Sequence, residues 1–215
     1  MTIEKKPNFK LRIISGVVLG VLFASSLFWL PLLQYFIIPV IAAGMLAEWY
    51  DITNSSTLYL LLGLIIIPLS IISLLLITNI SNIWLLLTYA IIIVSVDSFA
   101  MFGGITFKGP KLAPIISPNK TISGLICGVL GAGLMIKLLS FLPQYNVPEL
   151  FANHLFIISI IMAAISQVSD LFISFFKRKF GVKDSGSIIP GHGGILDRFD
   201  SIILTSPILL ILLMI

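Results

Sequence analysis

Charged side chains are scarce in this sequence. Asp, Glu, Lys and Arg make up 10% of its 215 residues, whereas 58% of the residues are hydrophobic and the mean hydropathy is +1.14. Several apolar runs approach or exceed the ~20 residues that a helix needs to cross a bilayer. So little charge excludes an ordinary soluble domain. It predicts an all-α fold, a polytopic membrane helical bundle that forms a single integral membrane domain over residues 1–215.

Cysteine is almost absent as well. The one cysteine, Cys127, lies inside an apolar run, so no intramolecular disulfide is available and we interpret the residue as a small packing residue. A cleavable signal peptide is not expected, because the first apolar run ends at Trp29-Leu30-Pro31 without a small-residue cleavage pattern and further apolar runs follow it. We therefore expect the first segment to remain as a membrane helix.

Seven apolar runs are separated by polar, proline-containing or glycine-containing links, which predicts about seven transmembrane helices. The fifth run is rich in glycine, and small residues at such spacing let helices approach closely in lipid. The predicted spans cover residues 13–30, 32–49, 58–77, 83–102, 122–142, 155–176 and 195–215.

Lys and Arg are missing from every second link. If the N-terminus is cytoplasmic and the spans alternate, all of the 13 Lys and Arg residues except Lys137 lie in or next to cytoplasmic segments. Cytoplasmic loops of membrane proteins carry such an excess of basic residues, so we predict a cytoplasmic N-terminus. The net charge of +4 has the same explanation, and no nucleic-acid partner is expected.

Four aspartates are the main candidates for chemistry. Asp97 and Asp170 lie inside predicted spans, each within about 10 Å of the cytoplasmic end at 1.5 Å per residue. An ionisable group at such a depth usually faces a protein-lined cavity and has a partner. Asp197 and Asp200 are three positions apart and share one face of a helix that begins near residue 195.

Each aspartate also has a purely structural interpretation. Asp97 and Asp170 would be hydrogen-bonded to their neighbours, and Asp197 and Asp200 would cap a helix at the positive end of its dipole. Taken together, however, carboxylates from two helices can converge on a divalent cation, because Mg²⁺ takes oxygen ligands and substrate phosphates.

A cationic shell and a glycine turn surround these aspartates. Residues 190–194 read Pro-Gly-His-Gly-Gly and come directly before a predicted helix, where backbone N–H groups bind phosphate oxygens. The turn is not a P-loop, which needs GxxxxGK followed by Ser or Thr. His192 is either an acid, base or phosphate donor or a structural turn residue. The basic residues are Lys177, Arg178, Lys179, Lys183 and Arg198, with Lys108, Lys111 and Lys120 from the other loop.

These residue types are what metal-assisted phosphoryl or nucleotidyl transfer requires. Residues 91–215 are therefore interpreted as the catalytic part, with cytoplasmic loops at 103–120 and 177–195, and residues 1–90 as scaffold helices. An ion-coupled transporter that uses Asp97 and Asp170 is an alternative. It is disfavoured because Gly and Pro interruptions do not recur in matched halves of the chain.

Two motifs resemble a known family. The first comprises Ser174-x-x-Lys177-Arg178, then Lys183-Asp184, then Pro190 to Asp200, which reads PGHGGILDRFD. The second comprises Asp97, Ala100 and Gly104, then Lys111-Leu112-Ala113-Pro114 and Ser117-Pro118-x-Lys120-Thr121. Both resemble the phosphatidate cytidylyltransferases, also called CDP-diacylglycerol synthases. The chain departs from that family's usual pattern at Met101, Ile105 and Ser123.

The resemblance implies that CTP and phosphatidate, a membrane lipid, react to CDP-diacylglycerol and pyrophosphate with Mg²⁺, and K⁺ is a candidate second cation. It implies a bacterial-type inner membrane, an active site facing the cytoplasm, and a homodimer as a candidate assembly. The implied metal ligands are Asp170, Asp197, Asp200 and Asp97. Further catalytic residues are Asp184, Lys183 and His192, and the substrate-binding residues are Lys177, Arg178, Arg198, Ser117, Lys120, Thr121, Gly193 and Gly194.

One rival enzyme stays open, a CTP-dependent polyprenol or phytol kinase, because it also needs a cytoplasmic nucleotide site in a helical bundle. An alcohol phosphotransferase that uses CDP-activated lipids is not expected, since its DGxxAR…GxxxDxxxD pattern is absent.

Overall fold

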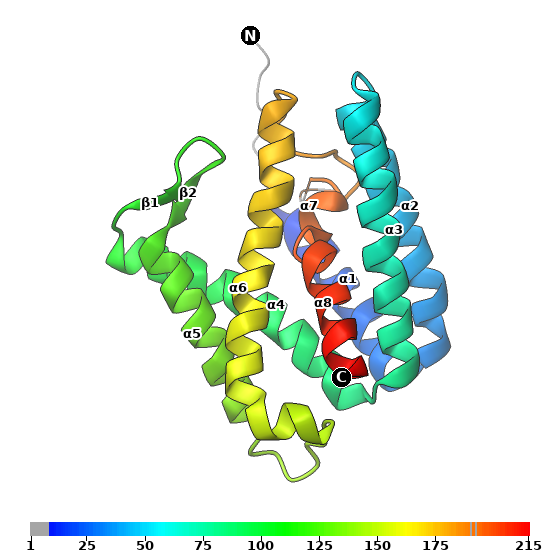
Figure 1. Cartoon of the computed structure of the whole chain (residues 1–215), viewed down its shortest axis with the longest axis vertical. Helices are drawn as coiled ribbons and strands as arrows, with labels where there is room; N and C mark the ends of the chain where they lie inside the picture. The colour runs from blue at the N-terminus through cyan, green and yellow to red at the C-terminus, as the bar shows by residue number, and fades with distance from the viewer. Residues whose placement is uncertain (1–8, 190, 192) are drawn as a thin grey trace.

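The computed structural model describes residues 9–189, 191 and 193–215, and most of this length is helical (Figure 1). The prediction of a helical bundle is confirmed, with one short antiparallel hairpin in addition. The helices are α1 (Phe9–Phe28), the 3-10 helix η1 (Pro31–Leu33), α2 (Gln34–Thr53), α3 (Thr57–Ile80), α4 (Ile83–Phe107), α5 (Ile122–Leu139), α6 (Glu149–Lys179), α7 (Leu196–Phe199) and α8 (Ile202–Met214). The strands are β1 (Lys111–Ala113) and β2 (Ser117–Thr121).

Within the described residues, 5 segments are long and apolar enough to cross a membrane. They correspond to η1 with α2, and to α3, α4, α5 and α6. The chain is therefore a membrane protein. The terminal helix α8 has 13 residues and rises only about 20 Å, which is less than the ~30 Å hydrocarbon core of a bilayer.

The predicted last span, residues 195–215, is divided into α7 and α8. Ser169 of α6 inserts its hydroxyl between the two: Oγ donates to the carbonyl oxygen of Asp200 and accepts from the N–H of Leu204 at 3.2 Å. A side chain inserted into the i to i−4 hydrogen bonds interrupts a helix. The break thus arises from a tertiary contact with α6.

Asp97 and Asp170 lie deeper along their helices than the predicted spans implied. Helix α4 continues to Phe107 and α6 to Lys179, beyond the expected ends at residues 102 and 176. At 1.5 Å per residue, Asp97 is about 15 Å and Asp170 about 14 Å from these ends, so the predicted distance of about 10 Å was too short.

Helix α6 runs through the middle of the molecule and packs against α4, α5 and α8, while α8 also packs on α3 (Figure 1). The close approach predicted for the glycine-rich helix is confirmed at the contact of α5 with α4. A Cβ atom on Gly128 would lie 2.6 Å from the carbonyl oxygen of Val96, and one on Gly124 would lie 2.7 Å from that of Ala100. Backbone, not a movable side chain, occupies that space.

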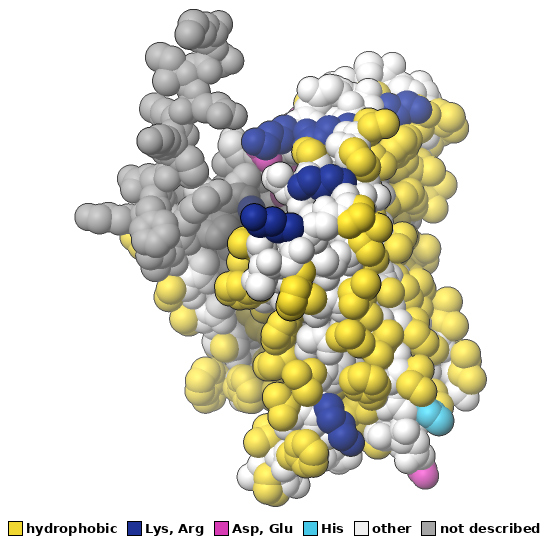
Figure 2. Space-filling model, turned by 90° about the vertical axis from the view of Figure 1, so that its left-hand side faces the viewer, with side chains coloured by type: hydrophobic (Ala, Val, Ile, Leu, Met, Phe, Trp, Pro, Cys, Tyr) yellow, Lys and Arg dark blue, Asp and Glu magenta, His cyan; other side chains and the backbone are white. Residues whose placement is uncertain are grey.

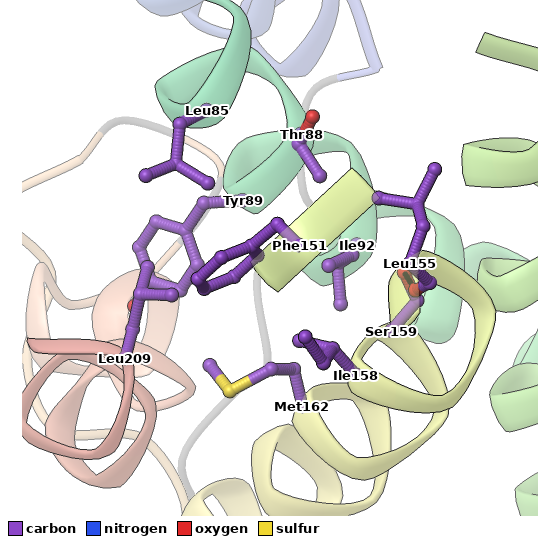
Figure 3. Close-up of a pocket in the computed structure, with 10 residues that line it drawn as sticks. All are labelled: Leu85, Thr88, Tyr89, Ile92, Phe151, Leu155, Ile158, Ser159, Met162 and Leu209. Carbon is purple, nitrogen blue, oxygen red and sulfur yellow. Dashed lines mark hydrogen bonds between the residues drawn. The ribbon is translucent and has the colours of Figure 1, made fainter. Parts of the chain in front are cut away.

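An apolar pocket lies between α4, α6 and α8, lined by side chains such as Leu85, Phe151 and Leu209 (Figure 3). The hydroxyls of Tyr89 and Thr205 are hydrogen-bonded at 2.6 Å, which satisfies two buried polar groups in this region. The lining holds no charged side chain. A phosphate-bearing substrate would find no cationic partner here.

We predict that Gly128→Ala destabilises the protein by about 1–3 kcal/mol, because the new methyl group overlaps a backbone carbonyl and forces α4 and α5 apart. Thermal unfolding of the detergent-solubilised protein measures the effect. Gly20→Ala in α1 is the control, since no atom lies within 4 Å of a Cβ there. Equal melting temperatures for the two variants would contradict the close helix contact.

Candidate active site

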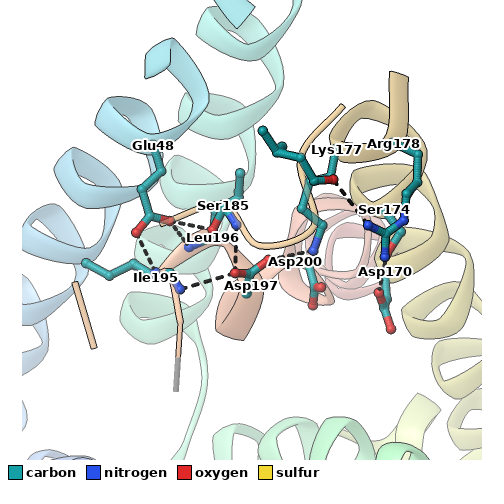
Figure 4. A network of polar contacts seen from close by, with 12 residues as sticks. Glu48, Asp170, Ser174, Lys177, Arg178, Ser185, Ile195, Leu196, Asp197 and Asp200 are labelled. Carbon is teal, nitrogen blue, oxygen red and sulfur yellow. Dashed lines mark hydrogen bonds and ion pairs between the residues drawn. The ribbon is translucent and has the colours of Figure 1, made fainter. Parts of the chain in front are cut away.

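Asp197 is the centre of a polar network at the end of the bundle where α6, α7 and the 180–195 loop meet (Figure 4). Its Oδ1 accepts from Lys177 Nζ at 2.5 Å. Its Oδ2 accepts from two backbone N–H groups, that of Ser185 at 2.8 Å and that of Gly194 at 3.1 Å. The side chains of Asp197 and Lys177 are each 10% exposed, so this is a largely buried ion pair.

The environment of Asp197 favours its ionised form. Burial raises the pKa of the carboxyl group, but the hydrogen bond and charge of Lys177 lower it, as do the N–H groups of Ser185 and Gly194. The lowering effects prevail, and the pKa lies below the ordinary carboxyl value. Asp197 is therefore ionised at neutral pH, and its hydrogen bonds fix the orientation of the carboxylate group.

A second chain of contacts joins α4, β2 and α6. Asp170 Oδ2 accepts from Lys120 Nζ at 2.5 Å, and its Oδ1 accepts from Ser174 at 3.1 Å. Lys120 also donates to Gln167 Oε1 at 3.0 Å, and Gln167 Nε2 donates to Asp97 Oδ1 at 2.9 Å. Gln167 therefore connects Lys120 to Asp97. As a result, Asp97 and Asp170, which both lie on predicted membrane spans, belong to one hydrogen-bonded network.

Asp200 lies beside this second chain and is 8% exposed. Burial raises its pKa well above the ordinary value, and the neighbouring charges of Asp170 and Asp97 raise it further, against the lowering effect of Lys177. Ser169, the neighbour of Asp170, donates to the carbonyl oxygen of Asp200, and Asp170 is linked to Asp97 through Lys120 and Gln167. The three aspartates therefore lie on adjoining parts of α4, α6 and the link between α7 and α8.

The donor atoms of this region suit a hard divalent cation, because clustered carboxylate oxygens with excess negative charge are what Mg²⁺ binds. The side chains do not form a ready cage, however. Within residues 9–189, 191 and 193–215, no three His, Cys, Asp or Glu side chains are grouped as metal ligands. Lys120 and Lys177 instead neutralise Asp170 and Asp197.

The predicted phosphate-binding residues lie around the same end of the bundle. Arg178 reaches from α6 to the hairpin: its Nε donates to the carbonyl oxygen of Ile116 at 3.1 Å, and Nη1 donates to that of Val182 at 3.2 Å. Ser117 begins β2, and Thr121 caps α5 by accepting from the N–H of Gly124 at 3.0 Å. Lys and Arg side chains gather over this end of the surface, above a largely hydrophobic body (Figure 2).

The remaining predicted residues lie on the loop and on α7. Lys183 and Asp184 are exposed on the loop after α6, and Arg198 lies in α7. Gly193 has a φ of +86°, a conformation that favours glycine, and a Cβ there would be 3.2 Å from Asp197 Oδ2. His192 lies outside the described residues.

Two residues of the network were not predicted from the sequence. Glu48 of α2 is 2% exposed, and its carboxylate accepts from the N–H groups of Ile195 and Leu196. The sequence pattern placed it next to Trp49 and Tyr50, which indicated only a membrane interface. Gln167 carries no charge and therefore gave no signal in an apolar helix.

Two comparisons relate the chain to known proteins. Residues 52–215 match the model of the family described as "Cytidylyltransferase family". The phosphatidate cytidylyltransferase of Rickettsia bellii is 55% identical over 210 residues, which are 96% of this chain and 91% of that protein. That of Rickettsia felis is 56% identical over 211 residues, 96% and 92% of the two chains. That of Bacillus subtilis is 42% identical over 117 residues, 54% of this chain and 42% of that protein.

We predict that Lys177→Met shifts the acid sensitivity of the fold. A carboxyl group with a lowered pKa stabilises the folded state above its unfolded pKa, and this stabilisation is lost as the pH falls through the folded pKa. Without Lys177 the pKa of Asp197 is no longer lowered, so the variant should be less stable than the wild type at neutral pH and should lose less stability than the wild type as the pH falls. Melting temperatures measured across acidic pH test this shift. Lys111→Met, at an exposed position, should follow the wild type, and coincident curves for all three proteins would contradict the assignment.

Proposed function

Since this chain belongs to the cytidylyltransferase family, we propose that it is a phosphatidate cytidylyltransferase and makes CDP-diacylglycerol and pyrophosphate from CTP and phosphatidate. The identity of 55% to a protein of that name, over 96% of the chain, carries the proposal. The aligned part includes the aspartates and lysines of the site, and such a network of carboxylates and ammonium groups at the end of a membrane bundle suits a reaction between a nucleotide and a lipid headgroup.

The proposed topology has seven spans, with α1 and the segment formed by α7 and α8 added to the five long helices, and a cytoplasmic N-terminus. The distribution of Lys and Arg supports this orientation. The active site then faces the cytoplasm, where CTP is available, from the inner membrane of a bacterial-type cell. Residues 1–90 act as scaffold and residues 91–215 as the catalytic part.

In the proposed reaction, a phosphate oxygen of phosphatidate attacks the α-phosphorus of CTP. A new P–O bond forms, the bond between the α-phosphorus and the bridging oxygen breaks, and pyrophosphate leaves with that electron pair. Transfer between two anions needs groups that reduce their repulsion and align them. Lys177, Arg178, Lys183 and Arg198 bind phosphates, while Ser117, Lys120, Thr121, Gly193 and Gly194 complete the substrate site.

The two paired lysines can bind phosphate without leaving their aspartates. An ammonium group has three N–H donors. Lys177 uses one on Asp197, so two remain for phosphate oxygens, and Lys120 uses two, on Asp170 and Gln167. Each carboxylate then orients an ammonium group toward the substrate. Asp184 assists from the exposed loop after α6, and a catalytic role of His192 stays a prediction from the sequence.

Asp170 and Asp197 are the proposed ligands of Mg²⁺, with Asp200 and Asp97 as further ligands. Held by these carboxylates, Mg²⁺ would supply positive charge next to the phosphates. The carboxylate oxygens of Asp97, Asp170 and Asp200, which are the ligand type that Mg²⁺ prefers, support a cation in this region. A second cation such as K⁺ and a homodimer stay predictions.

We expect the label of CTP carrying a radioactive α-phosphate to appear in lipid, and the label of the γ-phosphate to appear in pyrophosphate. Purified protein, phosphatidate and Mg²⁺ suffice for this assay. Label from the γ-phosphate in lipid would instead identify a polyprenol-kinase type of reaction and refute the proposal.

Asp197→Asn should lower kcat by at least about a hundredfold, because it removes an anionic ligand and the partner of Lys177. Chelation of Mg²⁺ should abolish the activity of the wild type, and added Mg²⁺ should restore it. Asp51→Asn is a matched control, since Asp51 is exposed on α2. Full activity of the folded Asp197→Asn protein would exclude the assigned role.

A further inference from the structure

Glu48 is a buried carboxylate in the scaffold half of the chain. It is 2% exposed, and its side chain points from α2 toward the start of α7 (Figure 4). Oε1 accepts from the N–H of Ile195 at 2.9 Å. Oε2 accepts from the N–H of Leu196 at 2.8 Å and from Ser185 Oγ at 2.7 Å. Burying a charge is costly unless it is hydrogen-bonded, so three donors on one carboxylate indicate a specific arrangement.

The donors of Glu48 and those of Asp197 belong to the same residues or to direct neighbours. Ser185 donates its N–H to Asp197 and its hydroxyl to Glu48. The N–H of Gly194 points to Asp197, and the next two N–H groups along the chain point to Glu48. One carboxylate therefore holds the backbone that presents hydrogen bonds to the other.

The backbone is wrapped tightly around Glu48. A Cβ on Gly186 would lie 2.5 Å from Glu48 Oε1, and a Cβ on Gly194 would lie 2.4 Å from Oε2. Glycine at both places lets the loop touch the carboxylate from two sides. The loop position thus depends on where α2 places this one side chain.

We propose that Glu48 is a positioning residue for the transfer reaction: it holds Ser185 and residues 194–196 so that Asp197 and Lys177 face the substrates. The inference rests on the proposed function and extends it to a residue outside 52–215, the part that matches the family model. Glu48 touches no substrate in this role. It acts through Ser185 and Gly194 on Asp197.

Glu48→Gln and Glu48→Ala test the proposal. The glutamine keeps the size of the side chain, but its amide NH₂ must face one of three donors, so one hydrogen bond is lost and a donor opposes a donor. We expect kcat to fall about tenfold for glutamine and about a hundredfold for alanine, since the change reaches Asp197. KM for CTP should stay within about threefold, because Arg178 and Lys183 bind phosphate without contacting Glu48.

Hydrogen exchange gives a readout that does not depend on activity. Peptides that cover residues 185–196 should exchange faster in Glu48→Gln than in the wild type, while the hairpin peptides over residues 111–121 should not change. Ser185→Ala keeps the backbone donor to Asp197 and removes only the hydroxyl that donates to Glu48. This variant should also lower kcat, as Glu48→Gln does. Combined with Glu48→Gln, its effect should be smaller than the product of the two single effects.

Two controls match the substitution. Glu149→Gln changes the same residue type at an exposed position at the start of α6, and Asp51→Asn removes an exposed carboxylate from α2 itself. Both should retain wild-type kcat. If the wild type forms no CDP-lipid, the proposed function fails.

If the wild type is active and Glu48→Gln has unchanged kcat per folded molecule, the positioning role is refuted, even when the melting temperature falls. If Glu48→Ala does not fold, Glu48→Gln and Ser185→Ala still decide between the outcomes.

Discussion

A carboxylate buried at the end of a helical bundle must be compensated within the protein, and the arrangement of this molecule follows from that requirement. Asp197 is compensated by Lys177 and by two backbone N–H groups, Asp170 by Lys120, and Glu48 by three hydrogen-bond donors. Apart from the N–H of Gly194, which is three residues from Asp197, each of these contacts joins different segments of the chain. The polar groups of the site therefore also determine how α2, the hairpin, α6 and α7 meet.

The membrane body and the polar end have different kinds of packing. In the body, glycine and hydroxyl side chains allow close contact, as at Gly128 of α5 against Val96 of α4. Lipid offers no hydrophobic driving force between helices, so such contacts and internal hydrogen bonds hold the bundle together. At the polar end, ion pairs between lysine and aspartate hold the segments together. The hydroxyl of Ser169 links the two regions, because it interrupts the last helix next to Asp200.

The charge arrangement also bears on catalysis. Lys120 and Lys177 are held by Asp170 and Asp197 and retain N–H donors for phosphate. In the proposed reaction, such preorganised donors would lower the barrier without rearrangement. The acidic region of Asp97, Asp170 and Asp200 lies deeper, along the membrane helices, and provides oxygen atoms of the kind that divalent cations bind.

The sequence by itself determined the class of the protein. Long apolar runs predicted the membrane helices, since backbone in lipid must satisfy its own hydrogen bonds, and the dense motif from Ser174 to Asp200 indicated the family. Local patterns could not reveal which carboxylate meets which donor. Glu48 and Ser185 are hydrogen-bonded across 137 residues of sequence, and Gln167 reaches Asp97 across 70. Such pairs form only when helices pack in three dimensions. The tertiary structure alone therefore decided that Asp197 pairs with Lys177, that the last span is broken, and that a scaffold helix holds the loop of the site.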